Sequence, residues 1–242
     1  MRVPRFFDQD LMQGLRYGLW AGLAVLTVVL PLHGGAGPAS RFPPAQQVLH
    51  RQLDFGGAPA TFDARRLAQW VVASADNGTR PFVILDKKDA RVFVFAASGR
   101  LLGATPVLLG HALGDDTVPG IGTRPIEAVR PEERTTPAGR FVSVPGRNTL
   151  DEDVLWVDYG AAVSMHRVRL TNPAEQRAER LSSPTVADNR ISYGCINMPV
   201  PFFEQVLWPN LRGGKGVVYV LPEEKSLEQA FPTFGAPTVL AG

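Results

Sequence analysis

From Arg80 onward, the sequence pattern changes to a period of two, which is typical of β-strands. Phe82 to Leu85 and Val92 to Phe95 flank a polar turn and predict a β-hairpin. Further strands are predicted after the turn at Ser98 and after the turn that begins at Thr136. The complete set of these later strands covers 101–110, 136–144, 154–157, 162–170 and 216–221.

Two stretches have helical spacing instead. Asp63 to Ala75 carries apolar side chains on one helical face and precedes Asn77-Gly78, which predicts the end of a helix. Val200 to Leu207 begins beside prolines, which are tolerated in a first helical turn. With 24 glycines and 21 prolines, the composition fits many short strands better than a helical bundle. We therefore expect a mainly β fold, a sandwich or barrel with a few short helices.

The composition limits the class of protein. A chain of 242 residues with 45% hydrophobic and 20% charged residues fits one compact domain with a small appendage. A formal net charge of +2 is too balanced to predict nucleic-acid binding. One cysteine and four histidines exclude an internal disulfide and a Cys/His zinc cluster, and we expect no metal site.

The N-terminus has the three parts of an export signal. Arg2, Arg5 and Arg16 precede the uncharged run 17–32, and small residues follow at 34–39. Residues 1–39 are predicted to be a cleaved signal peptide or an uncleaved anchor held in the membrane by 17–32; a buried helix of the domain is the alternative. In either export case the body lies in the periplasm or another extracytoplasmic part of the envelope, and only this segment meets the membrane.

The single cysteine is either a buried small hydrophobe or a nucleophile. Cys195 lies in a loop between Ser192 and Asn197, just before the helix predicted at 200–207. A helix N-terminus and a neighbouring histidine would both lower its pKa. The N–H groups of Gly194 and Cys195 are candidate oxyanion donors.

A cysteine nucleophile needs a base, and His166 is the best candidate. Strand alternation places it on the face of Val168 and Leu170, with Arg167 on the other face. The alternative is a histidine that is simply satisfied within the core. His50 and His111 have no comparable partner.

Together these motifs resemble the L,D-transpeptidase (YkuD-type) catalytic domain, over Arg80 to Pro222. The resemblance rests on Ser-x-Gly-Cys-Ile-Asn at 192–197, the upstream His166, and Thr-Pro-x-Gly-x-Phe at 136–141. It also rests on the opening hairpin that leads into Leu108-Leu109-Gly110. It divides the chain into the signal at 1–39, a linker and helix at 40–79, the catalytic domain at 80–222 and a tail at 223–242.

The resemblance implies a cysteine acyltransferase that acts on the peptide stems of peptidoglycan without a metal or organic cofactor. Cys195 would form a thioester with a tetrapeptide stem and release D-alanine. An amine would then take the acyl group: another stem, a lysine of an envelope protein or a free D-amino acid. His166 would move the proton, the carbonyl of Arg167 would orient its ring, and Ser192 and Asn197 would hold the cysteine loop.

The sequence departs from the family at two places. Tyr193 stands where the family commonly has histidine, and the connection at 167–191 is longer than usual, so it forms either a lid or a mobile loop. Arg190 is our candidate for a clamp on a stem carboxylate, because a guanidinium matches a carboxylate. Two other functions stay open: a hydrolase of the carboxypeptidase or amidase type on the same scaffold, and a non-catalytic peptidoglycan-binding module.

Overall fold

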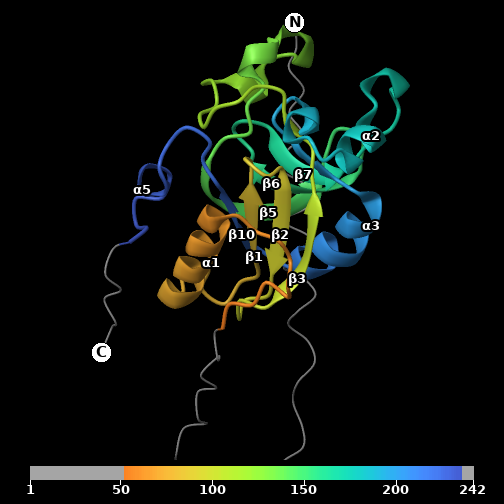
Figure 1. The fold of residues 1–242 in the computed structure, drawn as a ribbon. Helices are drawn as coiled ribbons and strands as arrows, with labels where there is room; N and C mark the ends of the chain where they lie inside the picture. Colours follow the sequence, from red (N-terminus) through yellow and green to blue (C-terminus); the bar gives the residue numbers. More distant parts are fainter. Residues whose placement is uncertain (1–51, 236–242) are drawn as a thin grey trace, which may run out of the picture. The chain divides into compact units, whose positions relative to one another are not determined.

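The computed structural model describes residues 52–235, and its centre is one eight-stranded sheet (Figure 1). The strand order is β3-β2-β1-β10-β5-β6-β7-β9, and β4 and β8 form a separate parallel pair. The strands are β1 Phe82–Asp86, β2 Arg91–Phe95, β3 Leu101–Pro106, β4 Leu109–Gly110, β5 Gly139–Arg147, β6 Asp153–Asp158, β7 Val163–Arg167, β8 Arg190–Ser192, β9 Ile196–Met198 and β10 Gly216–Val220.

The sheet curls toward a barrel. Leu108, which follows edge strand β3, forms an antiparallel bridge with Asn197 in the opposite edge strand β9. The two main-chain hydrogen bonds of this bridge are 2.8 and 2.9 Å long. The predicted mainly β class is therefore confirmed, with the two edges of the sheet drawn together.

The strand predicted at 101–110 is two strands, β3 and β4. The chain changes partners between them: β3 pairs with β2, whereas β4 pairs with β8. Val107 and Leu108 are both fully buried at this change, so the apolar pattern continues across it. Periodicity alone therefore could not show the break. The last predicted part of 162–170 is also not strand, because β7 ends at Arg167.

Strands β1, β2 and β10 are covered on both faces. Phe82, Phe93 and Tyr219 pack on one face against α1 Phe62–Ser74. Val83 and Val218 lie on the other face, where the helical segment at 200–211 packs. Figure 1 shows α1 and α3 on opposite sides of these strands. Double coverage explains why these strands are apolar at nearly every position.

Helix α1 confirms the helix predicted at 63–75. Thr61 is its N-cap, and its hydroxyl accepts a hydrogen bond of 3.2 Å from the N–H of Ala64. The helix stops at Ala75, whose φ of 56° is left-handed, rather than at the Asn-Gly pair that follows.

The helical segment after β9 is longer than the predicted 200–207. It runs through α3 Val200–Phe202, a π-helical turn at Phe203–Leu207 and α4 Trp208–Leu211. The remaining helical elements are short. They are α2 Arg177–Ser182, α5 Leu227–Ala230 and the 3₁₀ turns Ile121–Thr123, Ile126–Ala128, Pro131–Glu133, Pro173–Glu175 and Val186–Asn189.

The chain beyond Pro222 packs on the domain as far as it is described. Leu227 and Phe231 are buried in the same core as α1, and Ser226 caps α5. The sequence predicts a loosely attached tail from Pro222 onward, and these contacts contradict that prediction. The predicted export segment lies outside the described residues. Within 52–235, every helix is too short or too polar to cross a membrane.

We expect Leu67→Ala to lower the free energy of unfolding by about 2–5 kcal/mol, because Leu67 is fully buried between α1 and the sheet. Chemical denaturation measures this change. Gln69→Ala, at an exposed position of the same helix, is the control and should stay within about 0.5 kcal/mol. Equal effects of the two substitutions would contradict the packing of α1 on the sheet.

Candidate active site

The parallel pairing of β7 with β9 brings the candidate base beside the cysteine. Met165 is opposite Ile196 and His166 is opposite Asn197, so Cys195 lies at the start of β9 across from Ser164. The Ser164 hydroxyl is 3.7 Å from the Cys195 sulfur, and His166 lies two positions further on the same face. Cys195 is partly exposed, so a substrate can reach its sulfur.

The ring of His166 is oriented by its own main chain. Nδ1 is 2.8 Å from the carbonyl oxygen of Arg167. A carbonyl only accepts hydrogen bonds, so Nδ1 carries the proton and, in the neutral ring, Nε2 is free to act as a base. The contact between the His166 ring and the Arg167 carbonyl, which the family resemblance implies, is therefore present.

The two side chains shift each other's pKa values. Burial raises the pKa of the Cys195 thiol, but the hydrogen bond and charge of His166, with hydrogen bonds from Ser164, lower it more. Burial lowers the pKa of His166, whereas its interactions with Cys195 and the carbonyl of Arg167 raise it more. Both net shifts favour a thiolate next to an imidazolium, which is an activated nucleophile beside its acid.

Two side chains hold the main chain of the cysteine loop. The Ser192 hydroxyl donates to the Cys195 carbonyl at 2.6 Å, and the Asn197 amide donates to the same oxygen at 3.2 Å. This is the positioning predicted for both residues. The N–H of Gly194, however, donates to the Ser192 hydroxyl at 3.1 Å. It is therefore occupied, so of the two predicted donors the N–H of Cys195 remains the candidate.

Gly194 is required by the backbone. Its φ is +121°, and a Cβ there would lie 2.8 Å from the carbonyl oxygen of Thr135. Any side chain would strain the loop and push it away from the main chain of Thr135. The close approach to Thr135 explains why this position is glycine.

Tyr193 is exposed and stacks with a cation. The guanidinium carbon of Arg134 lies 3.9 Å from the centre of the Tyr193 ring. Arg134 also donates to the carbonyl of Val129, at 3.1 and 3.2 Å, which fixes its orientation. The aromatic ring thus holds a positive charge at the rim of the cysteine loop.

The long connection at 167–191 contacts the site. Arg177, at the start of α2, donates to the side-chain oxygen of Asn197 at 2.6 Å. Its charge also opposes protonation of His166, although more weakly than the terms that raise that pKa. Sequence reasoning missed Arg177, because nothing in a polar loop distinguishes the one arginine that folds back.

Arg190 lies apart from the His166 side chain. It lines a cavity with Glu223, whereas His166 lines a different cavity of about 260 Å³ with Arg167 and Glu152. The Arg190 guanidinium donates to the carbonyl of Lys87 at 3.0 Å and pairs with Glu223. One edge of the predicted clamp is therefore occupied by a carboxylate of the protein itself.

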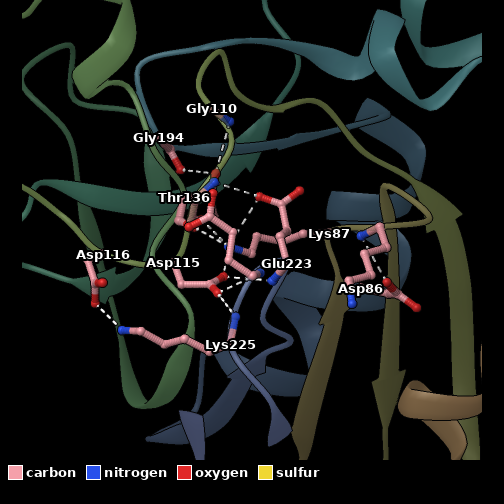
Figure 2. A network of polar contacts seen from close by, with 12 residues as sticks. Asp86, Lys87, Gly110, Asp115, Asp116, Thr136, Gly194, Glu223 and Lys225 are labelled. Atoms are coloured by element: carbon pink, nitrogen blue, oxygen red, sulfur yellow. Dashed lines mark hydrogen bonds and ion pairs between the residues drawn. The ribbon is translucent and has the colours of Figure 1, made fainter. Parts of the chain in front are cut away.

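A buried lysine lies behind the cysteine loop (Figure 2). Lys87 is 0% exposed, and its ammonium donates to Asp115 at 2.9 Å and to the carbonyls of Gly114 and Thr136 at 2.5 and 3.0 Å. It also lies 3.5 Å from Glu223. A buried ammonium is stable only with such a complete set of partners, so these segments are held together.

Thr136 connects this network to the cysteine loop. Its hydroxyl donates to the carbonyl of Gly194 at 2.9 Å and accepts from the N–H of Gly110 at 2.9 Å (Figure 2). Thr136 is part of the turn that carried the family resemblance, but its partners were not predictable from sequence. The carbonyl of Gly194 is thereby connected, through Thr136, to the ammonium of Lys87.

Asp115 anchors the C-terminal part of the network. It accepts hydrogen bonds from the main-chain N–H groups of Glu223, Glu224 and Lys225, at 2.7 to 2.9 Å. Burial raises the pKa of Asp115, but these donors and Lys87 lower it more, so the net pKa lies well below its usual value. Among residues 52–235, no group of three His, Cys, Asp or Glu side chains is arranged to hold a metal ion.

Comparison with known proteins gives matches among solved structures only: no family model and no curated protein matches this chain. The chain is similar to the helical cell shape determining protein Pgp2 from Campylobacter jejuni, with 16% identity, 65% of this chain and 55% of that chain covered, and a TM-score of 0.41. An L,D-transpeptidase from Mycobacterium smegmatis matches with 15% identity, 60% and 59% coverage and a TM-score of 0.34.

An L,D-transpeptidase from Enterococcus faecium matches with 16% identity, 59% and 50% coverage and a TM-score of 0.32. The matched part is thus between 50% and 59% of the length of these three proteins. L,D-transpeptidases are the family that the sequence motifs resemble.

We expect the alkylation rate of Cys195 by iodoacetamide to rise with pH around a midpoint below the usual thiol value of about 8.5, because the thiolate is the reactive form. His166→Gln should move the midpoint upward. Arg212→Gln, which removes one exposed positive charge elsewhere, is the control. The same midpoint in the original chain and in His166→Gln would contradict the pairing.

We expect Asp115→Asn to lower the free energy of unfolding at neutral pH by about 3 kcal/mol, because it removes the carboxylate from a buried lysine. The folded pKa of Asp115 is depressed, so its stabilisation is present above about pH 4 and is lost as the pH falls toward the folded value.

Chemical denaturation across pH 2–7 measures both effects. The original chain should lose stability in acid more steeply than Asp115→Asn. Asp116→Asn, which breaks only an exposed ion pair with Lys225, should cost less than about 1 kcal/mol. If Asp115→Asn lowers the free energy of unfolding as little as Asp116→Asn does, the stabilising role of the Lys87 network is contradicted.

Proposed function

We propose that this protein is a cysteine acyltransferase of the L,D-transpeptidase type that acts on peptidoglycan stem peptides. The observation that carries the proposal is the activated pair: His166, oriented by the Arg167 carbonyl, lowers the pKa of a partly exposed cysteine. The motif at 192–197 and the turn at 136–141 support the substrate class by resemblance.

In the acylation step, the Cys195 thiolate attacks the carbonyl carbon of the third residue of a tetrapeptide stem. The oxygen becomes an oxyanion, for which the N–H of Cys195 is the remaining candidate donor. The C–N bond to D-alanine then breaks, and protonated His166 gives its proton to the leaving amine. A thioester and free D-alanine result.

In the second step, an amine attacks the thioester and gives its proton to His166, and the thiolate leaves. The new amide joins two stems, or links a stem to a protein lysine or to a D-amino acid; water in place of the amine gives a carboxypeptidase. The substrate lies in the cell wall, so the proposal includes export by residues 1–39, either cleaved or kept as an anchor at 17–32.

The full chain incubated with a tetrapeptide stem or a carbapenem should gain the mass of one acyl group, measured by intact-protein mass spectrometry. Cys195→Ser should show no stable adduct, because an ester in place of the thioester needs a far stronger base to form. His166→Gln should slow adduct formation by about 100-fold or more, the usual size of a general acid–base contribution.

The products separate the alternatives. A cross-linked or exchanged stem supports the transferase, and a tripeptide stem alone indicates the hydrolase. A chain that binds wall fragments but acquires no adduct at Cys195 would be a non-catalytic module, and the proposal would be wrong. Thermal denaturation of Cys195→Ser near that of the original chain excludes loss of the fold as the cause.

A further inference from the structure

A second cavity, of about 590 Å³, adjoins the cysteine loop through β8. Volumes of this size accommodate small ligands. Its wall combines apolar side chains with charged ones, and the mechanism derived above uses none of them. The wall residues that matter here are Lys88, Leu113, Arg180, Arg190, Ile191 and Glu223.

Arg190 lines this cavity and has an unused donor. Its side chain is 8% exposed, and its Nη2 serves the Lys87 carbonyl and Glu223. Its Nη1 is buried and has no hydrogen-bond partner in residues 52–235. A buried guanidinium nitrogen without a partner is unfavourable, and an anionic oxygen would satisfy it.

The cavity also carries surplus positive charge. Lys87 and Arg190 are balanced by Asp115 and Glu223. Lys88 forms no ion pair with any residue in the described part of the chain, 52–235.

Arg180, in α2, is the other cation of this wall without an ion pair among the described residues. Its guanidinium donates only to the main-chain carbonyls of Glu175 and Asp188, so its charge is also not neutralised.

We propose that this cavity binds a free carboxylate of the donor stem peptide. Nη1 of Arg190 donates to one carboxylate oxygen, Lys88 and Arg180 attract the charge, and Leu113 and Ile191 contact the apolar part of the peptide. Arg190 therefore offers the ligand one nitrogen and not a bidentate contact, because Glu223 occupies the other edge of the guanidinium.

Strand β8 connects this cavity to the cysteine loop. The strand begins at Arg190 and ends at Ser192, whose hydroxyl holds the Cys195 carbonyl. A carboxylate bound at one end of this short strand is thus placed at a fixed separation from the nucleophile at the other. The identity of the ligand as a stem peptide rests on the proposed function. The negative charge of the ligand is inferred from the cavity alone.

The test measures binding of a tetrapeptide stem to the full chain carrying Cys195→Ser, which prevents turnover, by titration calorimetry. Lys88→Glu should raise the Kd about ten-fold or more, because it reverses one charge at the carboxylate. Lys215→Glu, an exposed lysine outside the cavity, makes the same change in net charge and should leave the Kd within two-fold. Arg190→Lys, which keeps the pairing charge but removes Nη1, should also weaken binding.

Peptides in which single carboxylates are amidated identify the group. Amidation of the bound carboxylate should weaken binding to the original cavity but not to Lys88→Glu, whether that group is the C-terminus or a side chain. Equal Kd values for Lys88→Glu and Lys215→Glu, or for free and fully amidated stems, would overturn the inference.

The two proposals fail separately. Acylation of Cys195 with no effect of Lys88→Glu on stem binding overturns the carboxylate site and leaves the acyltransferase standing. Binding that needs both the carboxylate and Lys88, in a chain that never acylates Cys195, supports the site and overturns the acyltransferase.

Discussion

The register between β7 and β9 is the constraint on which the site depends. His166 and Cys195 belong to different strands, and only their parallel pairing, with Met165 opposite Ile196, places both side chains together. A slip of one residue would turn Ser164 and His166 to the other face of the sheet. The bridge between Leu108 and Asn197 pins β9 from its second side, so the register is held by two neighbours.

Behind this pair, a polar interior replaces the usual apolar packing. Lys87 joins the end of β1 to the segments around Gly114 and Thr136, and Thr136 in turn reaches the residue before Cys195. A buried polar network that is only partly hydrogen-bonded destabilises a fold more than an apolar core does. The stability of each of these contacts therefore depends on the others. The cysteine loop is thereby supported by directional hydrogen bonds in addition to its own short strand.

Sequence patterns predicted most strands, helix α1 and the pair of His166 and Cys195, because these depend on local periodicity and on rare residue types. They failed where the deciding contact is distant. Lys87 lies in the polar run Asp86 to Asp89, which is typical of an exposed turn, yet its ammonium is completely buried. Arg177 resembles its neighbours in a charged loop, and only the folded chain shows which arginine meets Asn197.

The three consecutive N–H groups that close on Asp115 come from residues 223–225, after the last strand of the sheet. During synthesis, all ten strands and α1 emerge before these three residues, and only the short helix α5 follows them. The support behind the cysteine loop is thus completed last, and the thiol acquires its ordered surroundings only when nearly the whole domain has emerged. Late completion of this kind would leave the Cys195 sulfur without ordered neighbours until the fold around it is finished.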